Sequence, residues 1–264
     1  MHEMDSFGLY PASLGKILFI EQPQFLRFLY VNQAISSKNF VTSFWKSLQR
    51  YLEMEELGEC ELGTHKYWEI RYNNELKEFK NNGDPGEIWF GEDIVDRILR
   101  WFGKNLDKIG KNSKILDVGC GNGMLLIDMS NEGFTNLYGV DYSLQAIELA
   151  KSIADKHTKN INYSVCDILS GLNDIFFIIH DKGTYDAISL SKNSFNNRNK
   201  YIENVFECLE DNGYLFITSC NWTQSELEQH FINKFILFEV IPTPQFKFGG
   251  KIGNVVTSVV FKKK

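Results

Sequence analysis

The chain has 264 residues, of which 43% are hydrophobic and 23% are charged, and this composition is typical of a globular protein with a full core. Its formal net charge of −6 argues against nucleic acid as a partner, because nucleic-acid binding needs clustered Lys and Arg, and it favours a basic protein partner. The five cysteines and five histidines are scattered, so we expect no disulfide framework, no metal site and a reducing compartment, either cytoplasm or nucleus. No run of about 18 uncharged apolar residues occurs, so we expect no membrane span.

The first 53 residues differ from the rest of the chain. They are rich in aromatic side chains but show no steady helical or strand period, so we interpret 1–53 as an N-terminal extension of uncertain structure. Residues 54–264 are predicted to form a single domain. Its first elements are amphipathic helices expected at Tyr67–Lys80 and Glu92–Leu106, separated by a turn at Asn82–Gly86.

The run Lys114–Gly123 joins a short apolar strand to a helix expected at Met124–Ser130. Glycine lacks a Cβ, so this backbone can take a positive φ and let a ligand lie against it, and the helix N-terminus offers unpaired N–H groups. A dinucleotide loop has the spacing G-x-G-x-x-G, whereas this loop reads G-x-G-x-G and is preceded two residues earlier by Asp117. A carboxylate there suits a positively charged amine better than a pyrophosphate. The pattern resembles the first motif of class I S-adenosylmethionine (SAM) methyltransferases.

Two further predicted strands lead to acids at the same edge of the sheet. The strand at Asn136–Asp141 ends 18 residues after the last glycine of the loop, close to the offset of about 20 at which a carboxylate reaches ribose hydroxyls. The strand at Asn160–Val165 leads to Asp167. Together with Asp117, these strand ends predict a βαβαβ unit with carboxylates along one edge, and separate capping roles explain the three acids poorly.

The remaining periodic segments alternate between helices and strands and finish with two strands in succession. The expected helices are Leu144–Lys156, Arg198–Leu209 and Glu226–Phe231, and the expected strands are Asp174–Asp181, Tyr214–Ser219, Phe235–Ile241 and Val255–Phe261. This order predicts an α/β fold with a Rossmann-like sheet that is mostly parallel, has an antiparallel C-terminal strand pair and carries helices on both faces.

Seven short runs occur in one order along the chain. They are Trp68–Tyr72, Gly86–Gly91, Asp117–Gly123, Gly139–Ser143, Asp181–Ser189, Thr218–Thr223 and Pro242–Gly250. Together they resemble class I SAM-dependent protein-lysine methyltransferases of the group that modifies translation elongation factor 1-alpha (the methyltransferase-like protein 10 / elongation factor methyltransferase 4 family). The glycine motif is shared by all class I methyltransferases. The D-K-G-T, S-C-N-W-T and F-x-F-G-G runs are far more specific for this group.

The resemblance implies SAM as the cofactor and assigns its binding to the three strand ends. Asp117 and the first two glycines of the loop would hold the aminoacyl end of SAM. Asp141 would bind the ribose hydroxyls, and Asp167 with the N–H of Ile168 would bind the adenine edge, in agreement with the chemistry of carboxylates and hydroxyl donors. The expected cofactor-binding residues are Asp117, Gly119, Cys120, Gly121, Asn122, Gly123, Asp141, Tyr142, Asp167 and Ile168.

The resemblance also implies a protein substrate, elongation factor 1-alpha, methylated on a lysine. An apolar channel lowers the pKa of a lysine amine, and an acceptor must then orient it. Asp181, at the end of the predicted fourth strand, is the first candidate for that acceptor. Tyr185, Asn221 and Trp222 are further candidates for the channel wall, with ordinary packing an equal alternative for Trp222. Two phenylalanines of 242–250 lie on a lid-like hairpin.

Other functions fit the same residues. One is a class I methyltransferase that acts on a small molecule or on another protein residue, and another is a non-catalytic nucleotide-binding protein. For Trp89, a position over the cofactor competes with packing between two helices. We expect the protein to be a monomer.

Overall fold

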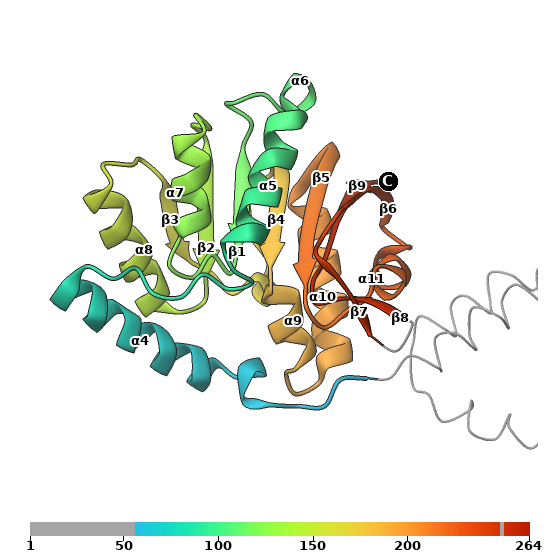
Figure 1. Cartoon of the computed structure of the whole chain (residues 1–264), viewed down its shortest axis with the longest axis horizontal. Helices are drawn as coiled ribbons and strands as arrows, with labels where there is room; N and C mark the ends of the chain where they lie inside the picture. The colour runs from blue at the N-terminus through green and yellow to red at the C-terminus, as the bar shows by residue number, and fades with distance from the viewer. Residues whose placement is uncertain (1–55, 249–250) are drawn as a thin grey trace, which may run out of the picture. The chain divides into compact units, whose positions relative to one another are not determined.

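The computed structural model describes the backbone of residues 56–248 and 251–264, and the side chains of 56–245 and 255–264 (Figure 1). The extension predicted for 1–53, and its boundary with the domain, lie outside the described residues. Within the described part of the chain, no helix is both long and apolar enough to cross a membrane.

The domain is built on a seven-stranded sheet (Figure 1). Its strands are β1 Ile115–Val118, β2 Leu137–Asp141, β3 Asn162–Val165, β4 Phe176–Lys182, β5 Leu209–Ser219, β6 Phe235–Ile241 and β9 Thr257–Lys263. The strands lie in the order β3-β2-β1-β4-β5-β9-β6. Neighbours from β3 to β5 pair in parallel, and β9 pairs antiparallel with both β5 and β6. The predicted sheet is therefore confirmed, with the last strand inserted between β5 and β6.

Helices cover both faces of the sheet. They are α4 His65–Asn82, α5 Glu92–Lys104, α6 Leu106–Ile109, α7 Met124–Asn131, α8 Leu144–Lys156, α9 Thr184–Ser189, α10 Ser194–Glu207 and α11 Gln224–Phe231, with short 3₁₀ helices η1 Glu61–Gly63 and η2 Ile168–Ser170. One hydrophobic cluster joins α4, α5, α7 and α8 to the sheet, and a second joins α9, α10 and α11. Consecutive residues of the central strands alternate between the clusters: Ile178 belongs to the first and Ile179 to the second.

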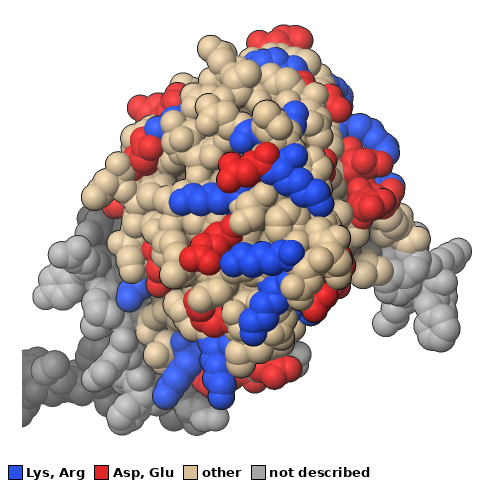
Figure 2. Space-filling view, turned by 90° about the vertical axis from the view of Figure 1, so that its left-hand side faces the viewer, with Lys and Arg blue, Asp and Glu red and all other residues tan. Residues whose placement is uncertain are grey.

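Helix α8 matches its predicted bounds, and α11 ends at the predicted residue but begins two residues earlier than Glu226. The Ser143 side chain accepts a hydrogen bond from the N–H of Ala146 and caps α8. Buried side chains then recur along α8 at a helical period, from Ala146 to Ala154. Thr223 and Glu226 form a capping box at the start of α11. On the face shown in Figure 2, Lys and Arg side chains are interspersed with Asp and Glu, so this face carries no large patch of one charge sign.

Helices α9 and α10 and strand β5 differ from the predictions. Helix α9 was not predicted, and α10 begins and ends earlier than the expected Arg198–Leu209. Strand β5 begins at Leu209, because the residues between Leu209 and Tyr214 form an irregularity in its pairing with β4 rather than a helix end. Between β6 and β9, the expected hairpin occurs as a separate pair of antiparallel strands, β7 Gln245–Phe248 and β8 Lys251–Asn254. The side chains of its two phenylalanines lie outside the described residues.

Candidate active site

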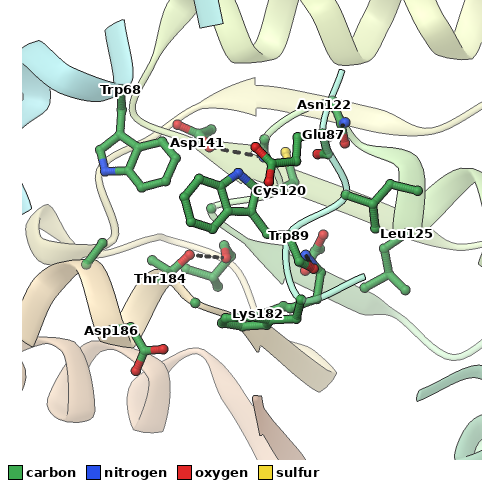
Figure 3. A pocket seen from close by; sticks show the side chains of 18 of the residues that line it. Trp68, Glu87, Trp89, Cys120, Asn122, Leu125, Asp141, Lys182, Thr184 and Asp186 are labelled. Atoms are coloured by element: carbon green, nitrogen blue, oxygen red, sulfur yellow. Dashed lines mark hydrogen bonds between the residues drawn. The ribbon is translucent and has the colours of Figure 1, made fainter. Parts of the chain in front are cut away.

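A pocket lies at the carboxyl ends of β1, β2 and β4 (Figure 3). This is the edge at which open α/β sheets bind ligands, next to the point where the strand order reverses between β1 and β4. Its walls come from the loop after β1, the ends of β2 and β4, helix α9, the turn after β5 and the segment 83–91. In the described part of the chain, no three His, Cys, Asp or Glu side chains cluster as metal ligands.

The loop between β1 and α7 requires glycine. Its three glycines all have positive φ, from 54° to 73°. A Cβ on Gly119 would lie 2.0 Å from Oγ1 of Thr184, and a Cβ on Gly121 would lie 2.4 Å from the hydroxyl of Tyr72. The neighbouring side chains therefore fill the space that any other residue would need, and the bare backbone forms one wall of the pocket.

Asp141 holds this loop from the end of β2. Its Oδ2 accepts a hydrogen bond from the N–H of Gly121 at 3.1 Å, and its Oδ1 accepts one from the N–H of Ser143 at 2.9 Å. The residue is only 7% exposed. Burial raises the pKa of Asp141 to about 6, even though the two N–H groups act in the opposite direction. A ligand that donates hydrogen bonds to this carboxylate would stabilise its ionised form.

Asp117 is held by a histidine on the neighbouring strand. Asp117 of β1 lies opposite His180 of β4, and Nδ1 of His180 is 2.8 Å from Oδ1 of Asp117. The other ring nitrogen of His180 is buried without a hydrogen-bond partner. A neutral imidazole carries one N–H, so this arrangement favours the tautomer in which Nδ1 donates to Asp117. His180 thus fixes the orientation of a carboxylate that lines the pocket.

The segment 83–91, which we call the cover segment, lies between α4 and α5 and supplies residues that line the pocket. Asn122 donates from Nδ2 to the backbone oxygens of Pro85 and Glu87, at 3.0 and 3.4 Å. Lys182 donates from Nζ to the backbone oxygen of Trp89 at 3.2 Å. The loop after β1 and the end of β4 therefore both hold the cover segment.

Two tryptophans line the pocket beside the cover segment (Figure 3). Trp68 of α4 and Trp89 have ring centroids 5.1 Å apart. The indole N–H of Trp68 donates to the backbone oxygen of Leu62 at 2.7 Å. The structure thus places Trp89 on the pocket, where its ring also packs against Trp68 of α4.

All but two of the predicted cofactor-binding residues line the pocket. They are Asp117, Gly119, Cys120, Gly121, Asn122, Asp141, Tyr142 and Ile168. Gly123 instead precedes α7, and its carbonyl accepts a hydrogen bond from the hydroxyl of Tyr163 at 3.2 Å. Asp167 caps η2 by accepting a hydrogen bond from the N–H of Leu169 at 2.9 Å.

Asp181 does not reach the pocket, so the prediction that it orients the acceptor amine needs correction. Alternation along β4 places His180 and Lys182 on one face and Asp181 on the other, where it is 0% exposed. Its carboxylate accepts hydrogen bonds from the N–H groups of Thr184 and Tyr185, each at 3.0 Å, and from the hydroxyl of Tyr201 at 2.6 Å. Burial raises the pKa of Asp181 to about 7. Asp181 therefore anchors the start of α9.

Tyr185 and Trp222 also lie away from the pocket. The hydroxyl of Tyr185 is 3.0 Å from Nδ1 of His230, and the indole N–H of Trp222 donates to Oγ of Ser189 at 2.9 Å. Both side chains are buried in the second hydrophobic cluster. Of the four predicted catalytic residues, only Asn221 lines the pocket.

The sequence reasoning missed a carboxylate on α9. Asp186 lines the pocket and is 5% exposed. It accepts hydrogen bonds from Oγ of Ser219 at 2.5 Å and from the N–H of Cys220 at 2.7 Å. The available signal was a second acid five residues after Asp181, but it falls in a helix that no periodic pattern revealed.

Comparisons with known proteins agree with this geometry. A family model described as "Methyltransferase domain" matches residues 109–246. The protein "EEF1A lysine methyltransferase 2" of Mus musculus is 45% identical over 207 residues, which cover 77% of this chain and 84% of that protein. "Protein-lysine N-methyltransferase efm4" of Schizosaccharomyces pombe is 36% identical over 230 residues, covering 79% and 97%. Among solved structures, N-methyltransferase NodS from Bradyrhizobium japonicum with S-adenosyl-L-homocysteine (SAH) has a TM-score of 0.55 at 17% identity, covering 74% and 98% of the two chains, and shows the same fold.

Proposed function

Because the chain belongs to the family of SAM-dependent protein-lysine methyltransferases that includes EEF1A lysine methyltransferase 2 and EFM4, we propose that it methylates a lysine of translation elongation factor 1-alpha. The observation that carries the proposal is the set of relatives named for this activity, which are 34–45% identical over 76–79% of the chain. The methyltransferase activity and the SAM cofactor follow from family membership. The elongation-factor substrate is the part that needs a test.

The pocket suits SAM in its own chemistry. The bare backbone of the glycine loop forms one wall of the pocket, and Asp117 and Asp141 line the same pocket. Asp117, held by His180, would bind the ammonium of the aminoacyl end, because a carboxylate and an ammonium form a charge-assisted hydrogen bond. Asp141 would accept hydrogen bonds from the ribose hydroxyls. Tyr142, which stacks on His65 with ring centroids 3.9 Å apart, and Ile168 would face the adenine.

Bound SAM would supply a methyl group on a sulfonium. The substrate lysine first loses a proton to solvent. The lone pair of its nitrogen then forms the bond to the methyl carbon, and the sulfur keeps the electrons of the broken bond. The protein's contribution is to align the two groups and to exclude water. Aromatic and apolar side chains dominate the wall at the cover segment, including Trp68, Ile88, Trp89 and Phe90. Such a wall lowers the pKa of an entering lysine and so favours its reactive neutral form.

The test combines the purified protein, labelled SAM and recombinant elongation factor 1-alpha. We expect label on one lysine, located by mass spectrometry and lost in the corresponding Lys→Arg variant. Absence of label from the elongation factor, with label appearing on a small molecule or another protein, would favour the alternative methyltransferase function. Calorimetry with SAM and NADH addresses the nucleotide-binding alternative, because tight NADH binding without SAM binding contradicts a methyltransferase.

We further propose that the enzyme acts as a monomer in the cytoplasm or nucleus, without nucleic acid or membrane as a partner. The scattered cysteines support a reducing compartment, and the negative net charge argues against nucleic acid as a partner. Light scattering of the purified protein and imaging of a tagged chain in cells would test these proposals, and a stable dimer or a membrane-bound pool would contradict them.

A further inference from the structure

One end of the pocket is separate from the groups assigned to SAM. It lies where α9 meets the turn after β5 and the segment around η1. The backbone there is tightly packed, since the N–H of Cys60 donates to the carbonyl of Leu190 at 3.2 Å. We call this region the acceptor end; its residues are Leu62, Asp186, Ala187, Leu190, Cys220 and Asn221.

Asp186 is the buried carboxylate of the acceptor end. The donors that hold it are all uncharged: the Ser219 hydroxyl, the N–H and thiol of Cys220, and the N–H of Asn221. Buried carboxylates are normally paired with a cation, because an unpaired buried charge is costly. Burial raises the pKa of Asp186, as expected for a carboxylate without such a partner. In the described part of the chain no ion pair to Asp186 occurs, so a cationic amine that enters the pocket would be its first charged partner.

The neighbours of Asp186 suit an aliphatic amine. Leu62, Ala187 and Leu190 present apolar surface to the same end of the pocket, and Asn221 adds an amide. A lysine side chain is complementary to these neighbours. Its apolar stem of four carbons matches the apolar wall, and its cationic tip donates hydrogen bonds to the acceptors. The other buried acids that line the pocket are assigned to SAM, Asp117 to its ammonium and Asp141 to its ribose hydroxyls.

We propose that Asp186 is a catalytic residue that accepts a hydrogen bond from the substrate lysine amine and aims its lone pair toward the methyl group, with the stem of the lysine lying against Leu62, Ala187 and Leu190. The proposal rests on the lysine-methyltransferase function proposed above. It gives Asp186 the role that the sequence reasoning gave to Asp181.

The decisive variant is Asp186→Asn, which keeps the size of the side chain and removes its charge. We expect kcat/KM for elongation factor 1-alpha to fall about 100-fold, because loss of the orienting contact misplaces the amine. We expect binding of the elongation factor in the presence of SAH to weaken about tenfold. Affinity for SAM in calorimetry and the melting temperature should both stay close to those of the parent protein. Asp155→Asn, an exposed acid on α8, is the matched control.

Each outcome bears on the proposal. Activity of Asp186→Asn within about twofold of the parent overturns it, and so does a parallel loss of stability and SAM affinity, which indicates a structural role. If Asp186→Asn does not fold, Ala187→Leu tests the same end of the pocket by filling it. That variant should lose elongation-factor binding while keeping SAM affinity, and retained activity overturns the proposal. A parent enzyme that binds SAM but leaves the elongation factor unmethylated refutes the proposed function itself, and the role of Asp186 is refuted with it.

Discussion

The ionisation of Asp141 predicts a pH dependence of SAM binding. Burial raises the pKa of this carboxyl from 3.8 to about 6 in the ligand-free protein. Because the folded state binds its proton more tightly than the unfolded chain, the contribution of Asp141 to stability is fully present below pH 3.8 and is lost as the pH rises through 6. The ionised carboxylate therefore destabilises the ligand-free fold at neutral pH by about 3 kcal/mol. Ribose hydroxyls that donate to it offset part of this cost.

The expected size of the effect follows from the ionised fraction of Asp141. With a pKa of about 6, the fraction is about nine-tenths at pH 7 and about one-tenth at pH 5. If SAM binds the ionised form, its affinity falls about tenfold between these pH values, which corresponds to about 1.4 kcal/mol. At pH 6, binding should release about half a proton.

Calorimetry at pH 5, 6 and 7, in buffers with different ionisation heats, measures both quantities. The control is Asp141→Asn, which should bind SAM more weakly and lose the pH dependence. Asp117 and Glu69 also act on Asp141 and raise its pKa, so the variant is needed to separate its titration from theirs. An affinity that does not change from pH 5 to 7 in the parent protein, or the same slope in Asp141→Asn, would refute the reasoning.

Three further substitutions and one control test the glycine loop, the cover segment and the role of Asp181. Gly121→Ala should weaken SAM binding at least tenfold and lower the melting temperature, because its Cβ would lie 2.4 Å from the Tyr72 hydroxyl. Gly103→Ala, in α5 with no atom within 4 Å of the added Cβ, should instead stabilise the fold by about 0.5–1 kcal/mol, and equal melting temperatures for the two variants would contradict this account. Asn122→Ala should release the cover segment, with SAM affinity several-fold weaker and faster hydrogen exchange in 83–91; unchanged exchange would argue against it. Asp181→Asn should lower the free energy of unfolding by about 1–3 kcal/mol with SAM affinity nearly unchanged, and the reverse result would return Asp181 to the site.

The elements that the sequence predicted well are those specified by neighbouring residues. Helix α8 has its predicted bounds because the cap at Ser143 and the apolar period of the helix are both local features. The loop after β1 could be predicted equally well. Its D-x-G-x-G-x-G spacing is a local feature and indicates that a ligand can lie against the backbone, whatever the tertiary contacts are. Most of the predicted cofactor-binding residues accordingly line the pocket.

The acceptor side could not be predicted in the same way. Helix α9 has six residues, which is too short for a hydrophobic period to appear. Side chains alternate between the two faces of β4, and this alternation decides which residue at the end of the strand faces the pocket. The sequence pattern favoured Asp181, which faces away from the pocket. The burial of Asp186 depends on Ser219 and Cys220, more than thirty positions away, which leave no local signal.

The position of β9 has a consequence for how the domain folds. This strand follows β6 in the sequence, yet it lies between β5 and β6 in the sheet, where Lys262 pairs with Tyr214 of β5 and Lys263 pairs with Phe235 of β6. Until it is in place, β5 and β6 each expose an unpaired edge, and such edges template association between chains. Strands this far apart in sequence also pair slowly, because the entropy cost of closing the loop comes before the stabilising contacts form. We therefore expect the pairing of β9 to complete the sheet, and a variant without 257–263 to aggregate rather than to form a smaller enzyme.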